Sequence, residues 1–272
     1  MKSARAIRNV VDLSREPEFH SERVSQILYG ETVTLTETRN DYSRVEMEDG
    51  YCGWARTNAF SDISSETSMG GDSNKLHRVV ANSVAIVDES GHPVRPYFLL
   101  YGSYLQLNSG RKVSNSTRVK LECAPGAYVV FSEDDFIPAD NSQSAKNPGQ
   151  SIVGTALRFL GAPYLWGGRS PLGFDCSGLV QIIFSMHGIS IPRDSAAQRE
   201  HGREVLRDEL QSGDLVFSDG HVVISMGAGA GGDEFIHASL GEGGVAINSY
   251  NKSRPDYRED LDRDYIIAKR FA

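Results

Sequence analysis

Cysteine, tryptophan and positive charge are all scarce in this sequence of 272 residues. Its three cysteines (Cys52, Cys123 and Cys176) are an odd number at wide spacing, which fits neither a disulfide framework nor a zinc motif. Lysine and arginine number 28 against 36 acidic residues, and a net charge of −8 argues against a protein that grips nucleic acid or an anionic membrane. We therefore expect free thiols, no metal and no nucleic-acid partner.

Long hydrophobic runs are also missing. No apolar segment approaches the ~20 residues that a membrane span requires. Residues 1–30 interleave arginine, aspartate and glutamate with apolar residues, so they lack the apolar core of a signal peptide. The composition, 39% hydrophobic and 24% charged, is typical of a globular chain. These features predict a monomeric cytoplasmic protein with no membrane contact.

Two stretches of small and polar residues divide the chain. Residues 61–74 and 139–150 carry little apolar spacing and contain glycine, serine and proline, which is typical of connectors. The length also suggests two or three domains. We predict domains at residues 1–65, 75–138 and 150–272.

The first two domains look like copies of one another. Residues 27–35 align with 99–107, and residues 44–48 align with 118–122. Both copies alternate apolar and polar residues between short turns, which predicts a small β-barrel in each. The first copy resembles the bacterial SH3-like domains through residues 26–31 and 50–54, whereas the second copy has drifted from that pattern.

The third domain begins with helical spacing and ends with strands. Apolar residues recur at helical intervals over 151–160 and again from Cys176 to Met186, with Gly188 beyond the second helix. Strand patterns then follow at residues 215–217, 221–226, 234–239, 245–250 and 265–270. Helices followed by an antiparallel meander predict an α+β domain.

Cys176 has a position suited to a nucleophile. It follows a glycine-rich loop and opens an amphipathic helix, where unpaired amides and the helix dipole stabilise an anion. A thiol in such a position can have its pKa lowered from ~8.5 to about 3.5–7.5. The alternative is a small packed thiol, and we keep that interpretation for Cys52 and Cys123 on their predicted strands.

Two of the seven histidines lie in apolar strand patterns. His221 opens an apolar strand directly after a polar turn, and His237 has apolar neighbours on both sides. An antiparallel hairpin through residues 227–232 would place them side by side, which completes a nucleophile, base and orienting residue. A structural role is the alternative for each. The other histidines are predicted to lie at the surface: His20, His77, His92, His187 and His201.

Six motifs in the third domain resemble, in the same order, the NlpC-type cell-wall cysteine peptidases. They span residues 163–168, 174–180, 191–198, 213–217, 221–224 and 235–238. The resemblance implies a papain-like fold with Cys176 as nucleophile, His221 as base, His237 as orienting residue and Tyr164 beside the nucleophile. The acidic turn at 218–220 is shorter than the usual approach to the base.

Together with two SH3-like domains, the chain resembles the γ-D-glutamyl-L-diamino acid endopeptidases that recycle murein peptides. The resemblance implies that the first SH3-like domain caps the cleft and that the substrate needs a free amino-terminal L-Ala. The implied contacts to the substrate ammonium are Asp175, Glu31 and Tyr51, and those to D-Glu are Ser177, Asp194 and Ser195. For Glu31, a solvated turn carboxylate is the alternative.

The predicted activity is therefore cleavage of the γ-D-glutamyl–diamino acid bond of murein tri- or tetrapeptides without metal or organic cofactor. In this mechanism the Cys176 thiolate attacks, the Cys176 amide and Tyr164 hold the oxyanion, and His221 moves the proton. One alternative is a wall-lytic hydrolase that acts on intact peptidoglycan stems. Another is a non-catalytic adaptor whose SH3-like pair binds a peptide.

Overall fold

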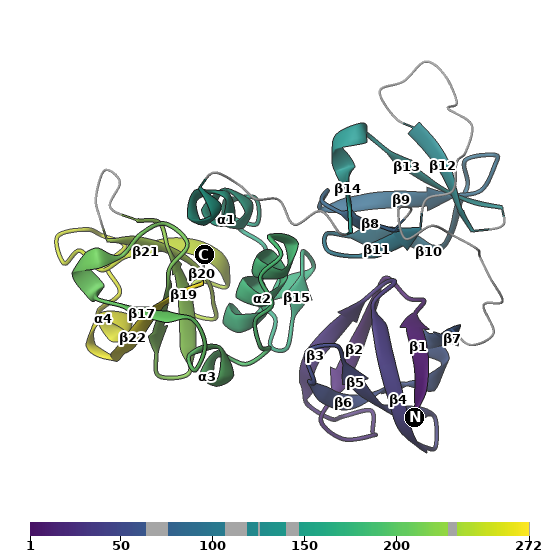
Figure 1. Cartoon of the computed structure of the whole chain (residues 1–272), viewed down its shortest axis with the longest axis horizontal. Helices are drawn as coiled ribbons and strands as arrows, with labels where there is room; N and C mark the ends of the chain where they lie inside the picture. Colours follow the sequence, from purple (N-terminus) through teal and green to yellow (C-terminus); the bar gives the residue numbers. More distant parts are fainter. Residues whose placement is uncertain (64–75, 107–118, 125, 140–146, 228–232, 272) are drawn as a thin grey trace. The chain divides into compact units, whose positions relative to one another are not determined.

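The computed structural model describes residues 1–63, 76–106, 119–124, 126–139, 147–227 and 233–271 (Figure 1). Contacts divide the chain into two compact units, Met1–Asn141 and Ser142–Ala272. Most of both predicted connectors and most of the predicted hairpin loop at 227–232 lie outside the described residues. No described helix is both long and apolar enough to cross a lipid bilayer.

Unit 1 begins with a seven-stranded antiparallel sheet in the order β3-β2-β6-β5-β4-β1-β7. Its core comes from alternate strand positions, among them Leu13, Ile27 and Val45, none of which is exposed. The strands are β1 (Lys2–Ala6), β2 (Val10–Ser14), β3 (Arg23–Leu28), β4 (Thr32–Arg39), β5 (Tyr42–Met47), β6 (Cys52–Arg56) and β7 (Phe60–Asp62), with a 3-10 turn, η1 (Thr57–Ala59), before β7.

The predicted small β domain is present here, and its sheet is open among the described strands rather than closed into a barrel. Its described strands pair from β3 at one edge to β7 at the other, and the two edges do not pair with each other. Alternation of apolar and polar residues reports which face of each strand is buried, but not whether the first and last strands meet.

Two smaller sheets form the rest of unit 1. Their strand orders are β10-β9-β13-β12 and β11-β8-β14, again without closure among the described strands. The strands are β8 (Leu76–Val79), β9 (Ser83–Val87), β10 (Pro93–Leu100), β11 (Tyr104–Gln106), β12 (Val119–Ala124), β13 (Ala127–Phe131) and β14 (Phe136–Pro138), with η4 (Glu133–Asp135) before β14.

One turn has the same construction in both halves of unit 1. The Leu28 N–H donates to Glu31 Oε2 at 2.7 Å, and the Leu100 N–H donates to Ser103 Oγ at 3.3 Å. Each turn contains a glycine with positive φ, +80° at residue 30 and +88° at residue 102, a conformation that glycine adopts without strain. The side chains at the aligned positions 31 and 103 therefore both accept a hydrogen bond from the backbone N–H three residues earlier.

Unit 2 combines a six-stranded antiparallel sheet with helices. The sheet order is β17-β22-β18-β19-β20-β21; α2 packs against β19 and β20, and α1 packs against α2 and β20 (Figure 1). The elements are α1 (Pro148–Leu157), β15 (Arg169–Ser170), β16 (Gly173–Phe174), α2 (Cys176–Met186), α3 (Ser195–Gln198), β17 (Arg203–Val205), η5 (Arg207–Glu209), β18 (Leu215–Ser218), β19 (His221–Ser225), β20 (Glu234–Ser239), β21 (Gly244–Ser249), α4 (Glu259–Arg263) and β22 (Tyr265–Arg270).

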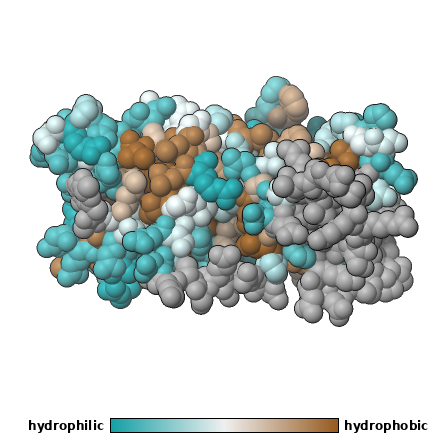
Figure 2. All heavy atoms as spheres, turned by 90° about the horizontal axis from the view of Figure 1, so that it is seen from above, coloured by the Kyte–Doolittle hydropathy of each residue, from teal (hydrophilic) through white to brown (hydrophobic). Residues whose placement is uncertain are grey.

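The predicted α+β arrangement of this unit is confirmed. The helix from Cys176 to Met186 has the predicted bounds, and the five predicted strands match β18 to β22 to within a residue at each end. The first helix differs, because Pro148 occupies its first turn and residues 148–150 are helical rather than part of a connector. On the face in Figure 2, apolar residues form patches bordered by hydrophilic ones.

Candidate active site

Cys176 is the first residue of α2 and is 8% exposed. The helix starts here because Asp175 caps it, accepting a 2.7 Å hydrogen bond from the Gly178 N–H. Gly178 also lets the helix approach the preceding loop, since a Cβ there would collide with the carbonyl oxygen of Gly168. The sequence thus fixes the thiol at a buried helix start.

The prediction of a lowered thiol pKa is wrong for the protein without a ligand. Burial, reinforced by the adjacent Asp175 carboxylate, raises the pKa of Cys176 to about 11. The backbone amides of Val222 and Ser177 hydrogen-bond to the sulfur and lower its pKa, but by less than burial raises it. Cys176 therefore rests as a neutral thiol, and its bond to Val222 places it at the start of β19.

The two predicted site histidines are in direct contact. His221 Nε2 lies 2.7 Å from His237 Nδ1, and the two rings meet edge to face. Burial lowers the pKa of His221 to about 3 and that of His237 to about 4, so both rings are neutral at pH 7. A neutral His221 can accept the proton of a neutral thiol.

A third side chain, Asn248, continues this row. Its Oδ1 lies 2.8 Å from His237 Nε2, and the residue is 5% exposed. Strand pairing brings His221, His237 and Asn248 to one face of the sheet, because alternate residues of a strand share a face. The pairing of Ile224 with Ile236 puts His221 and His237 on the same face, and the pairing of Phe235 with Asn248 puts Asn248 there too. Asn248 was not among the predicted site residues, because an asparagine in a short strand carries no motif of its own.

Asp175, Ser177 and Arg193 form a second buried cluster beside Cys176. Arg193 Nη1 and Nη2 donate to the two Asp175 oxygens at 3.0 and 2.6 Å, and Nη1 also donates to Ser177 Oγ at 2.9 Å. The Gly167 N–H donates a further 2.9 Å bond to Asp175 Oδ2. A substrate ammonium at Asp175 would thus join a carboxylate that Arg193 already shares. Arg193 was not among the predicted site residues, although it lies inside the motif at residues 191–198.

The other predicted residues of unit 2 lie around these clusters. Tyr164 is half-buried, and burial, together with the negative charge that Cys176 bears once deprotonated and with that of Asp175, raises its pKa to about 12, so it remains a phenol that can donate a hydrogen bond. Asp194 is the exposed residue before α3, and Ser195 is its half-buried first residue.

Glu31 and Tyr51 belong to unit 1. Glu31 is half-buried, and its Oε2 accepts a 2.7 Å hydrogen bond from the Leu28 N–H. Tyr51 packs against the core of the first sheet, and its hydroxyl lies 3.5 Å from the Val24 carbonyl oxygen.

Three surface or packing assignments need correction. His77 and His187 are half-buried, and His187 Nε2 lies 2.9 Å from Thr155 Oγ1, whereas His20, His92 and His201 are exposed as predicted. Cys52 is exposed and free rather than packed, because it is the first residue of β6 and lies directly after the turn that precedes this strand. Cys123 lies in β12.

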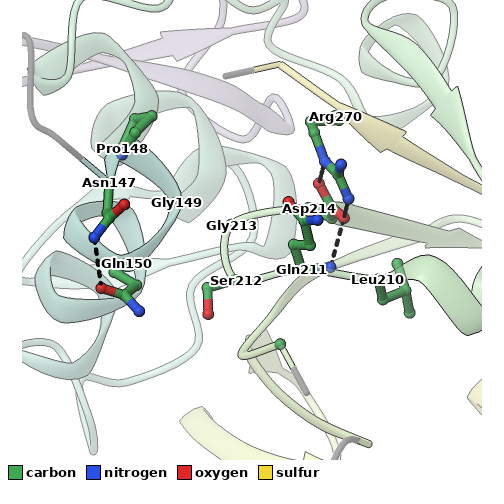
Figure 3. Close-up of a pocket in the computed structure, with 11 residues that line it drawn as sticks. Asn147, Pro148, Gly149, Gln150, Leu210, Gln211, Ser212, Gly213, Asp214 and Arg270 are labelled. Atoms are coloured by element: carbon green, nitrogen blue, oxygen red, sulfur yellow. Dashed lines mark hydrogen bonds and ion pairs between the residues drawn. The ribbon is translucent and has the colours of Figure 1, made fainter. Parts of the chain in front are cut away.

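A pocket of about 550 Å³ in unit 2 lies apart from these residues (Figure 3). The ion pair between Arg270 and Asp214 forms one wall, with bonds of 2.6 and 2.7 Å, and Asn147 and Gln150 lie opposite. None of the predicted site residues lines it. Within the described residues, no group of three histidine, cysteine or acidic side chains is arranged to hold a metal ion.

The comparisons with known proteins agree with this geometry. The NlpC/P60 family profile matches residues 161–261, and the bacterial dipeptidyl-peptidase SH3 domain profile matches residues 13–60. Dipeptidyl-peptidase 6 of Lysinibacillus sphaericus is 31% identical over 267 residues, which cover 95% of this chain and 96% of the relative. The chain belongs to the NlpC/P60 family. This membership confirms the prediction of a cysteine peptidase.

Two further relatives extend the match. A γ-D-glutamyl-L-lysine dipeptidyl-peptidase of Bacillus cereus is 29% identical over 264 residues, covering 91% of this chain and 74% of the relative. The crystal structure of an NlpC/P60 family protein from Bacillus cereus has a TM-score of 0.80 at 22% identity and covers 99% of both chains. That likeness shows the fold of this NlpC/P60 chain.

Proposed function

We propose that this NlpC/P60 peptidase cleaves the γ-D-glutamyl–L-diamino acid bond of murein tri- or tetrapeptides that carry a free amino-terminal L-Ala. The observation that carries the proposal is the buried Cys176 thiol, which bonds to the Val222 amide next to His221, together with the hydrogen-bonded row His221–His237–Asn248. The name of the Bacillus cereus relative, a γ-D-glutamyl-L-lysine dipeptidyl-peptidase, supports the substrate class.

The first half of the reaction forms a thioester. His221 Nδ1 takes the thiol proton as the Cys176 sulfur attacks the γ-glutamyl carbonyl carbon. The Cys176 N–H is one of the amides that a helix start leaves unpaired, and with the Tyr164 hydroxyl it holds the developing oxyanion. The C–N bond then breaks, and the departing amine of the diamino acid takes the proton from His221.

The second half returns the enzyme to its resting state. Water loses a proton to His221 Nδ1 and attacks the thioester carbonyl, which releases L-Ala-γ-D-Glu and restores the Cys176 thiol. Ser177, Asp194 and Ser195 are the proposed contacts to the D-Glu part of the substrate. Ser177 Oγ is already oriented by Arg193.

We assign Asp175, Glu31 and Tyr51 to the substrate ammonium. A buried ammonium needs carboxylates and hydrogen-bond acceptors, because an uncompensated buried charge is strongly unfavourable. The match of the SH3 domain profile to residues 13–60, which include Glu31 and Tyr51, supports a role of the first domain in specificity. We retain three domains, at residues 1–65, 75–138 and 150–272.

We further assign the enzyme to the recycling of murein peptides in the cytoplasm. The free thiols of Cys52 and Cys176 support a reducing compartment. The competing assignment is a wall-lytic hydrolase, which must accept peptides whose L-Ala is acylated.

The test compares L-Ala-γ-D-Glu-diamino acid with its N-acetylated form, by product masses and kcat/KM. We expect cleavage of the free peptide and a loss of roughly 10²–10³ in kcat/KM for the acetylated one, because a buried charge left unpaired costs about 3–5 kcal/mol. Glu31→Ala should lower kcat/KM for the free peptide and reduce the ratio of kcat/KM between the free and the acetylated peptide. Cys176→Ala is the inactive control. Equal kcat/KM for both peptides would overturn the recycling assignment and favour the wall-lytic one.

A further inference from the structure

The orientation of the Asn248 side-chain amide is fixed by its surroundings. Its Nδ2 lies 3.3 Å from Glu242 Oε1 and 3.2 Å from the Asp256 carbonyl oxygen, and both of these atoms only accept hydrogen bonds. If the amide were turned around, its Oδ1 would face these two acceptors with no hydrogen between them. Oδ1 must therefore point to His237.

This orientation dictates where the protons of both histidines lie. Because Asn248 Oδ1 only accepts, His237 Nε2 must carry the hydrogen of the 2.8 Å bond. The neutral His237 ring then has an unprotonated Nδ1, which accepts from His221 Nε2 across 2.7 Å. A neutral His221 that carries its proton on Nε2 has an unprotonated Nδ1.

We propose that Asn248 is a positioning residue that holds His237 and His221 in the one pair of tautomers that leaves His221 Nδ1 free to accept the Cys176 proton. The inference rests on the proposed function for the identity of the nucleophile and base. In the opposite pair, His237 Nδ1–H would donate to His221 Nε2, and a protonated His221 Nδ1 could not take the thiol proton.

The support of Asn248 extends to charged residues at the edge of the sheet. Glu242 Oε1 lies 3.6 Å from Arg258 Nη1, and the same Arg258 nitrogen donates to Ser239 Oγ at 3.2 Å. Arg258 also forms a two-point ion pair with Asp260. Arg258 thus lies beside the Glu242 carboxyl group whose Oε1 accepts from Asn248 Nδ2, which is the partner that the proposed amide orientation requires.

The groups that face the two histidines all bear on their protonation. The positive charge of Arg258 lowers the pKa of both rings, whereas Asp260 raises it for both and Glu242 raises it for His237. Asn248 is the neutral member of this set and touches a ring directly. Its hydrogen bond also raises the pKa of His237, but by less than burial lowers it, and Asn248 selects a tautomer without adding charge.

The test reads the tautomers directly by NMR of the full chain labelled with ¹⁵N-histidine. In the wild type, the nitrogen shifts should show the proton on Nε2 of both His221 and His237 at pH 7–8. Asn248→Leu should give a mixture that includes His221 protonated on Nδ1, and kcat should fall by about 10² or more with KM within twofold. Asn251→Leu, which removes another amide from the segment after β21, is the matched control and should change neither.

A conservative variant supplies a second readout. The carboxylate of Asn248→Asp still accepts from His237 Nε2 but favours a protonated His237, so the acid limb of the kcat/KM profile should move to higher pH by at least about one unit. Wild-type His221 with its proton on Nδ1, or Asn248→Leu with unchanged tautomers and kcat, would overturn the proposal. The wild-type spectrum decides even if Asn248→Leu does not fold.

The proposed function and this inference fail separately. The spectra need no substrate, and kcat is measured on whichever γ-D-glutamyl peptide, free or acetylated, the wild type cleaves. A wrong substrate assignment therefore leaves the tautomer result intact.

Discussion

Arg193 and Asp175 form a buried two-point ion pair, in which the side chains are 1% and 9% exposed and the bonds are 3.0 and 2.6 Å. The pair connects the loop before α3 to the residue that caps the catalytic helix. Removal of both charges from water is costly, and the attraction offsets that cost only while both partners are present.

Arg193→Met should therefore destabilise the protein by about 3–5 kcal/mol, because it leaves the Asp175 carboxylate buried without its cation. Urea unfolding gives the free energy of unfolding. The double variant Asp175→Asn with Arg193→Met should lose less free energy of unfolding than Arg193→Met alone. Arg199→Met, which breaks an exposed ion pair with Glu200, is the control and should change stability by less than about 1 kcal/mol. Equal losses of unfolding free energy in Arg193→Met and Arg199→Met would contradict the expectation that the buried ion pair matters more for stability than the exposed one.

The rate at which iodoacetamide alkylates Cys176 should rise with pH without a plateau between pH 7 and 9. Since burial raises the pKa of the thiol to about 11, the thiolate fraction grows roughly tenfold per pH unit throughout that range. Mass spectrometry of the peptide that contains Cys176 measures the rate, in a Cys52→Ser background that removes the exposed thiol. A plateau below pH 8 would instead support a thiolate in the free enzyme.

His221→Ala should reduce kcat far more than His237→Ala, because in the proposed mechanism His221 transfers protons while His237 orients it. General acid–base groups contribute about 10²–10⁴-fold, and the loss at His221 should fall in that range. Steady-state kinetics on the free tripeptide measures both variants. The exposed His201 is the control, and His201→Ala should keep wild-type kcat. Small and equal losses at His221 and His237 would return both to a structural role.

The free energy of unfolding should decrease as the pH falls from about 6.5 towards 4. The pKa of His237 is lowered to about 4 and that of His221 to about 3, so over this range the unfolded chain binds protons that the folded chain does not. His237→Gln should reduce the slope by at most about 1.4 kcal/mol per pH unit. Urea unfolding at several pH values measures the slope, and His20→Gln on an exposed loop should leave it unchanged. An unaltered slope in His237→Gln would show that this ring is protonated in the folded state.

Local sequence signals were sufficient to place Cys176, the proposed nucleophile, at a helix start. Asp175 is a strong helix cap, a glycine follows the helix, and the apolar spacing between them has a helical period, so the start of α2 at Cys176 follows from neighbouring residues alone. The strands that carry His221 and His237 were also predictable from neighbouring residues, because their apolar runs are bounded by turns.

Properties that depend on distant residues were not predictable. The pKa of Cys176 is set by how completely the fold buries it, and burial outweighs the helix start that the sequence displays. Arg193 and Asn248 act through partners 18 and 11 residues away along the chain, which no spacing rule identifies. Closure of the first sheet likewise depends on whether its edge strands meet.

The strand register of unit 2 also decides whether the proposed catalytic row can form. His221, His237 and Asn248 come from three successive strands, and a shift of one residue in the β20–β21 pairing would turn Asn248 to the opposite face. A chain that has formed α2 but has not paired β19, β20 and β21 holds Cys176 at its helix start without the contacts among these three side chains. The proposed base therefore gains its orienting partners only when these three strands have paired.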